Sequence, residues 1–175
     1  QPDAAQEWNI SKDGFVYTFN LKPDIYFHKH PIFGKDSTRT LNADDVVYSL
    51  SRLTSPKVAS PGSWVMQNVE SVNAVDSLQV QIKLKRPFPA FLSLLSMQYT
   101  SIVPLEMKKL DFRTSPIGSG PFYMKRWIEN EKLVLRKNPL YFEVDEIGKQ
   151  LPYLEAVAIT FLPDKQSEFM QFAQG

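Results

Sequence analysis

The 175-residue sequence contains no cysteine and only two histidines, and each shortage excludes some chemistry. Without cysteine there are no disulfides, no thiolate metal sites and no cysteine nucleophile. His28 and His30 could share one face of a strand and grip a metal, but no third ligand follows and Pro31 ends the strand. We therefore expect both to be loop histidines in solvent, and we predict neither a metal site nor a cofactor.

Excess charge and long apolar runs are missing as well. Twenty basic residues against nineteen acidic ones give a net charge of +1, which is not the footprint of a nucleic-acid-binding protein or of a polybasic membrane surface. No run approaches the roughly 18 apolar residues that a membrane span requires. A hydrophobic content of 43% and a charged content of 22% are globular values, so a core can form.

Aromatic or apolar residues occupy every second position from Phe15 to Leu21, directly after the turn dipeptide Asp13-Gly14. This pattern predicts a strand with one buried face, joined by a tight turn to a partner strand at Trp8–Ser11. Over Leu78–Leu84, apolar residues alternate with the polar residues Gln79, Gln81 and Lys83. This pattern predicts a half-buried strand that forms a second hairpin with the segment from Val69.

A helix should follow the first hairpin. Asn42 is a good N-cap, Asp45 stands three residues later as an acidic capping-box partner, and apolar residues then recur at helical spacing as far as Leu53. Asp44-Asp45 could be a catalytic carboxylate pair, but negative charge in the first turn favours the helix dipole. We interpret the pair as helix capping.

The remaining pattern completes a mixed α/β fold with antiparallel-rich sheets. Short helices are expected over Pro87–Leu95, from Pro104, and after Pro163-Asp164. In the last predicted strand, small residues alternate with large ones, which predicts cover on both faces. The predicted strands are Tyr99–Val103, Phe122–Trp127, Lys132–Lys137 and Glu155–Phe161.

Two loops are candidates for function. The turn Ser60–Trp64 displays a tryptophan, which either packs in the core or forms the wall of a cleft. Gly118-Ser119-Gly120 permits close backbone approach, but it lacks the spacing of a nucleophile elbow or a phosphate loop. We interpret it as a structural turn, with Ser119 at a cleft as the alternative. No His–carboxylate–Ser arrangement is evident, so the sequence predicts a protein that is not an enzyme.

Several segments, in this order along essentially the whole chain, resemble the family 5 extracellular solute-binding proteins, which are the peptide, dipeptide and nickel receptors of ABC importers. Gly118-Ser119-Gly120 alone would be a weak signal, and the order of the motifs gives the resemblance its strength. The loop after Phe27 is longer than the family's usual form, and Ser119 and Phe122 replace the commoner Thr and Tyr. The matching segments are Asp13-Gly14, Tyr17–Phe19, Phe27-His28, Leu41–Val46, Ser49–Leu53, Val75-Asp76, Pro116–Phe122, Leu133–Phe142 and Pro163–Gly175.

The resemblance implies a two-lobed receptor of the periplasmic-binding-protein type II, of which this chain is a part of lobe I. Residues 1–106 would be most of an accessory subdomain, residues 107–175 part of the base subdomain, and lobe II would lie outside the chain. Closure of two lobes around a ligand is a hinge-type change, and this fragment alone should bind ligand weakly or not at all. The native N-terminus would precede Gln1, and the chain would continue past Gly175.

The resemblance also implies partners, location and contacts. The ligand would be a dipeptide or oligopeptide, passed to the membrane permease of an ABC importer. The protein would be periplasmic or extracellular and anchored as a lipoprotein. Ligand contacts are expected from Trp64, Met97, Tyr99 and Ser119, since aromatic and methionine walls suit a ligand whose backbone is recognised. Core packing remains the alternative for each of these residues.

Two other functions stay open on the sequence. The many hairpins and the poverty of catalytic groups also suit a β-rich extracellular interaction or adhesion module without a small-molecule ligand. A hydrolase using Ser119 with His28 is a third hypothesis. We rank the transport receptor first.

Overall fold

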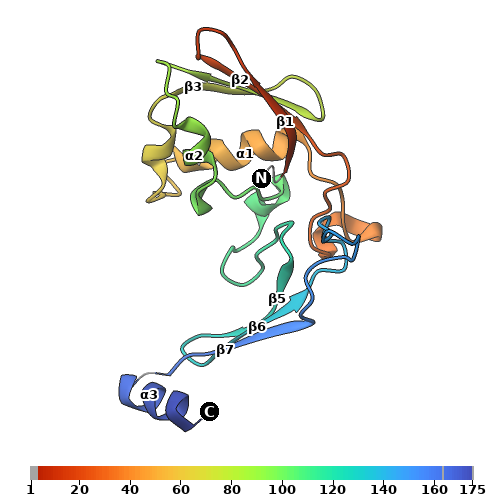
Figure 1. The fold of residues 1–175 in the computed structure, drawn as a ribbon, viewed down its shortest axis with the longest axis vertical. Helices are drawn as coiled ribbons and strands as arrows, with labels where there is room; N and C mark the ends of the chain where they lie inside the picture. The colour runs from red at the N-terminus through yellow and green to blue at the C-terminus, as the bar shows by residue number, and fades with distance from the viewer. Residues whose placement is uncertain (1–3, 163, 175) are drawn as a thin grey trace.

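The structure is a computed structural model that describes residues 4–162 and 164–174. Two antiparallel sheets lie in different parts of an elongated molecule, and helix α3 (Lys165–Gln174) lies beyond the smaller sheet (Figure 1). The predicted mixed α/β fold with antiparallel sheets is therefore confirmed.

The larger sheet has the strand order β1-β2-β4-β3. Its strands pair antiparallel throughout, and both predicted hairpins, β1–β2 and β3–β4, are confirmed. Alternation along β2 and β4 buries Tyr17, Ile82 and their same-face neighbours, so one face of the sheet faces the core. The strands are β1 (Ala5–Ile10), β2 (Val16–Leu21), β3 (Val69–Ala74) and β4 (Gln79–Leu84).

Helix α1 (Ala43–Leu53) packs against β3 and β4. Its predicted capping box is present: Asp45 N–H donates to Asn42 Oδ1 at 3.2 Å, and Asn42 N–H donates to Asp45 Oδ2 at 3.0 Å. Helix α2 (Phe91–Leu95) begins only after the proline-rich segment, so it is shorter than predicted. The Phe91 ring meets Tyr17 edge-on at 5.1 Å between centroids, which joins α2 to the core.

The smaller sheet has the order β5-β6-β7, from β5 (Phe122–Ile128), β6 (Lys132–Lys137) and β7 (Ala156–Thr160), as predicted. The prediction that the last strand is covered on both faces is wrong for the described residues. Strand β7 pairs only with β6, and of its five residues only Val157 is even partly buried. Its alternation instead places Val157 and Ile159 opposite Leu135 and Leu133 of β6.

Four 3-10 segments complete the fold: η1 (Pro31–Asp36), η2 (Ser63–Met66), η3 (Gln98–Thr100) and η4 (Leu105–Lys109). The predicted helical turn after Pro104 is confirmed by η4, but the predicted strand at Tyr99–Val103 is wrong. The Thr100 hydroxyl donates to the carbonyls of Leu95 and Met97, both at 2.7 Å. These local bonds close the chain into a turn where its β-branched residues suggested a strand.

Arg39 joins three elements in a network that the sequence did not indicate. Its guanidinium donates to both carboxylate oxygens of Asp45 at 2.7 Å, and its Nε donates to Glu106 at 2.9 Å. Asp45 is fully buried and also accepts the Leu105 N–H at 2.9 Å. Bonding to Asp45 raises the pKa of Arg39, and bonding to Arg39 lowers the pKa of Glu106. The network links the loop before α1, the first turn of α1, and η4.

The chain passes once from the larger sheet to the smaller one, between η4 and β5. Residues 22–42, between β2 and α1, leave the larger sheet, run beside the loops next to the smaller sheet and return (Figure 1). Within this excursion, His28 N–H donates to the Gly118 carbonyl at 2.7 Å, and the Lys22 ammonium lies 4.6 Å from the centre of the Phe142 ring. The two sheets are therefore linked by contacts as well as by the chain.

Candidate functional site

Trp64 is held outward by a short, well-anchored turn. Its two successors in η2, Val65 and Met66, are 1% and 5% exposed, whereas the Trp64 side chain is 43% exposed. Two adjacent apolar anchors fix the turn, and the indole is left on the surface. Of the two interpretations from the sequence, core packing therefore does not describe Trp64.

Tyr99 lies directly against the turn that displays Trp64. A Cβ placed on Gly62 would lie 2.5 Å from both Cβ and Cγ of Tyr99, so the tyrosine occupies the space that any larger residue at 62 would need. Tyr99 is half-buried and also packs against the core. Glycine at position 62 thus permits η2 and η3 to lie side by side.

Met97 belongs to the same surface through η3. Its carbonyl accepts the Thr100 N–H at 3.0 Å, and its side chain is half-buried. The chain beyond η3 is fixed on α1, because the Ser49 hydroxyl donates to the Val103 carbonyl at 3.1 Å and accepts the Val103 N–H at 2.9 Å. Three of the four predicted contact residues, Trp64, Met97 and Tyr99, therefore lie on two adjoining segments that pack on one helix.

Ser119, the fourth predicted residue, belongs to a different segment, just before β5. It lies between Gly118, whose main chain bonds His28, and Gly120, whose carbonyl accepts from Asn138 Nδ2 at 3.0 Å. In the described part of the chain, the main-chain and hydroxyl groups of Ser119 form no hydrogen bond. Its neighbours are fixed while its own polar groups stay available.

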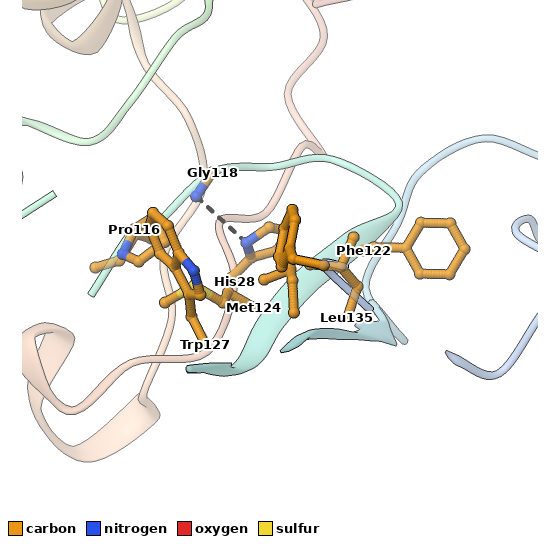
Figure 2. A pocket seen from close by; sticks show the side chains of 10 residues that line it. His28, Pro116, Gly118, Phe122, Met124, Trp127 and Leu135 are labelled. Atoms are coloured by element: carbon orange, nitrogen blue, oxygen red, sulfur yellow. Dashed lines mark hydrogen bonds between the residues drawn. The ribbon is translucent and has the colours of Figure 1, made fainter. Parts of the chain in front are cut away.

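An apolar groove of about 410 Å³ lies beside this segment. Figure 2 shows His28 between the Gly118 main chain and side chains of the smaller sheet, with Trp127 and Phe122 toward opposite sides. Among the described residues that line the groove, His28 is the one ionisable side chain. The lining residues are His28, Pro116, Ile117, Gly118, Phe122, Met124, Trp127, Leu133, Leu135 and Phe161.

His28 is buried, with 8% of its surface exposed, so the prediction of a solvent-exposed loop histidine is wrong for this residue. The Gly118 N–H donates to Nδ1 at 3.3 Å, and Nε2 lies 3.0 Å from the Gly120 carbonyl. Burial lowers the pKa of the imidazole, and the bond to Gly120 opposes this. Both nitrogens are engaged by main chain, so His28 is not free to act as the base for a Ser119 nucleophile, which argues against the hydrolase hypothesis.

Neither His28 nor His30 takes part in a metal-binding cluster. Within residues 4–162 and 164–174, no three His, Cys, Asp or Glu side chains are grouped to hold a metal ion. The His30 Nδ1 instead accepts the Ile32 N–H at 3.1 Å and caps η1. No helix in the same described ranges has the length and apolar character needed to cross a membrane.

Sequence reasoning did not find Asn138, which is almost fully buried beside the same glycines. Its side-chain oxygen accepts the Leu140 N–H at 3.0 Å, and its N–H donates to the Pro121 carbonyl at 2.8 Å. The one available signal was an asparagine directly before Pro139, which is typical of a turn. Its partner Gly120, 18 residues earlier in the chain, could not be inferred from that pattern.

Comparison with known proteins places this geometry in a family. The family model described as "Bacterial extracellular solute-binding proteins, family 5 Middle" matches residues 1–175. Among curated proteins, the probable di/tripeptide-binding protein 5 of Pseudomonas aeruginosa (strain UCBPP-PA14) is 34% identical over 99% of this chain and 35% of its own length. The chain thus spans about a third of the length of that relative.

Solved structures agree with the family match. The periplasmic binding protein DppA from Helicobacter pylori, in complex with peptide STSA, is 28% identical with a TM-score of 0.84, over 100% of this chain and 36% of its own. NikZ from Campylobacter jejuni, in complex with Ni(L-His), is 27% identical with a TM-score of 0.80, over 100% and 33%. The fold is that of periplasmic binding proteins, and the adhesion-module alternative is not favoured. The chain belongs to the family 5 bacterial extracellular solute-binding proteins.

Proposed function

We propose that this chain forms one side of the ligand cleft in the receptor of an ABC importer, which captures short peptides and delivers them to a membrane permease. The observation on which this rests most is the Trp64 indole, exposed yet fixed by buried neighbours and by the Tyr99 contact. A large rigid aromatic surface binds ligand with little loss of conformational freedom. Membership of the solute-binding family supports this use of the surface.

The ligand contacts we propose are Trp64, Met97, Tyr99 and Ser119. The first three supply an apolar and aromatic wall, which suits peptides of varied side chains because it does not select one charge. Ser119 supplies unpaired main-chain and hydroxyl groups for the peptide backbone. A wall of this kind binds and releases its ligand unchanged, so the proposed role is transport and not catalysis.

For the whole protein we propose two lobes. Residues 1–106 form most of an accessory subdomain of lobe I, residues 107–175 form part of its base subdomain, and the second lobe comes from sequence outside this chain. The match to about a third of each relative supports the part of this proposal that places a second lobe outside this chain. The location we propose is the periplasm or cell exterior, with a lipid anchor.

The test is thermal unfolding of the full-length protein with a panel of dipeptides, tripeptides and tetrapeptides. A ligand that binds only the native state raises the melting temperature by mass action. We expect a rise with some of these peptides, and about a tenfold or greater loss of affinity in Trp64→Ala, equal to about 1.4 kcal/mol or more.

Trp8→Ala is the matched control, since Trp8 has the same 43% exposure but lies on the edge strand β1. It should leave peptide affinity unchanged. No shift with any peptide would move the ligand class to metal chelates or sugars. A shift that Trp64→Ala leaves intact would remove this surface from the cleft.

A further inference from the structure

The His28 imidazole is held in one tautomer by the main chain around it. Gly118 N–H points at Nδ1, which must therefore offer a lone pair, and the Gly120 carbonyl faces Nε2, which must therefore be protonated. The ring is neutral in this arrangement. The same Gly120 carbonyl also accepts from Asn138, so two side chains from different parts of the sequence meet on one oxygen.

If the imidazole takes up a second proton, the new N–H on Nδ1 has no acceptor facing it. Protonation would place an N–H on Nδ1, directly facing the Gly118 N–H that now donates to it. Two donors facing each other in a buried site lose a hydrogen bond and leave both groups unsatisfied. The ring and the Gly118 main chain must then separate.

No neighbouring charge offsets this conflict. Segment 116–120 presents main chain, a proline, an isoleucine and the Ser119 hydroxyl, and β5 presents the Tyr123 ring at 6.1 Å together with apolar side chains. Strand β6 and residue 161 contribute apolar side chains, and the segment after β6 contributes the Asn138 amide. On its own segment, Lys29 is exposed and His30 caps η1. Within the described residues, no carboxylate bonds or pairs with the ring.

We propose that His28 is a proton-operated latch, which in its neutral form accepts the Gly118 N–H and so helps to fasten the excursion of residues 22–42 to the segment before β5, and which on protonation loses that bond. The bond from His28 N–H to the Gly118 carbonyl and the Asn138 bond do not depend on the ring proton. Release is therefore a local loosening of the link between the two sheets, and not unfolding. It requires no assumption about the ligand.

The direction with pH follows from the burial of the ring. The pKa of His28 in the folded state lies below the ordinary value of 6.5, so near neutral pH both folded and unfolded states are unprotonated. As the pH falls below 6.5, the unfolded state binds the proton first, and folded-state stability declines until the folded pKa is passed. The latch is closed at neutral pH and opens in acid.

The primary measurement is nitrogen-15 NMR of the imidazoles in the full-length protein, with the His28 signals identified by their loss in His28→Gln. Neutral Nε2–H and Nδ1–H tautomers differ in their nitrogen shifts, so the spectrum reads the tautomer directly. We expect an Nε2–H ring at about pH 7.5 that titrates below 6.5. A ring that mixes tautomers, or that titrates at or above 6.5, would overturn the proposal.

Amide hydrogen exchange tests the release itself. After correction for intrinsic rates, protection of the Gly118 amide should fall about tenfold or more between about pH 7.5 and about pH 4.5 in the unmodified protein. The glutamine side chain in His28→Gln has a hydrogen-bond donor and an acceptor but does not ionise, so protection of the Gly118 amide should not change with pH in this variant. His30→Gln, which removes the other histidine outside the junction, should behave as the unmodified protein does.

Equal protection of Gly118 at both pH values in the unmodified protein would refute the latch, whether or not any ligand binds. If His28→Gln does not fold, His28→Asn serves as the second variant, because its amide can still accept the Gly118 N–H. The proposed receptor function is judged separately by the peptide panel, since the NMR and exchange measurements are made without ligand.

Discussion

The contact between Gly62 and Tyr99 leaves no room for a methyl group. A Cβ at position 62 would lie 2.5 Å from Cβ and Cγ of Tyr99, and the Cβ atom cannot move away unless the tyrosine backbone moves. We therefore expect Gly62→Ala to cost about 1–3 kcal/mol of folding free energy, the usual range for overpacking. Chemical denaturation measures this loss.

Gly120→Ala is the control for that substitution. A Cβ there would meet no atom within 4 Å, and the residue is not in the left-handed region. The change should stay within about 0.5 kcal/mol. If Gly62→Ala proves equally neutral, Tyr99 does not rest on the turn as described, and the support for Trp64 would have to come from elsewhere.

At the residue scale, local chemistry was predictable and long-range pairing was not. Asn42 and Asp45 form the capping box that their spacing indicated, because both partners lie within one helical turn. His28 was expected in solvent, yet it is buried against glycines 90 and 92 residues later. Nothing in a single sequence states which distant main chain will meet a given side chain.

At the scale of elements, Arg39 connects the loop before α1 to the first turn of α1 and to η4 through its bonds to Asp45 and Glu106. Asp45 is buried, so its charge depends on the two guanidinium bonds at 2.7 Å for compensation. Lysine would keep the charge of Arg39 but cannot form the two-pronged pair. We expect Arg39→Lys to lower the free energy of unfolding by about 1.5–3 kcal/mol, the range for losing a hydrogen bond to a charged group.

The exposed pair between Lys83 and Glu70 provides the comparison, since both side chains are 48% exposed. Lys83→Ala should cost less than about 1 kcal/mol, because solvent screens such pairs. Equal losses in the two variants, measured by denaturant titration under the same conditions, would show that Arg39 adds nothing beyond a surface charge pair.

Element prediction succeeded where a periodic pattern and a turn signal agreed. The first hairpin has both an alternating pattern and the turn dipeptide Asp13-Gly14, and it is present as β1 and β2. The segment Tyr99–Val103 has β-branched residues but no partner strand, and Thr100 bonds to Leu95 and Met97 close it into a turn. The prediction that both faces of β7 are buried required elements packed on each face, and an alternating pattern does not show whether such elements are present.

At the scale of the whole molecule, the smaller sheet and α3 expose several large apolar side chains. Trp127, Ile159 and Phe161 are between 41% and 45% exposed, and Phe172 of α3 is 83% exposed. Large exposed apolar side chains favour association between molecules where they lie together. The two-lobed division proposed above accounts for their exposure through sequence outside the chain.

The single passage of the chain between the sheets has a consequence for limited proteolysis. The turn at Asp111–Thr114 is largely exposed and is the sort of site that proteases cut first. One cut there would produce two polypeptides that still share the His28 and Lys22 contacts with Gly118 and Phe142. The nicked pieces should elute together as one particle, because these contacts and the packing of Ile117 in the core do not pass through the cut turn.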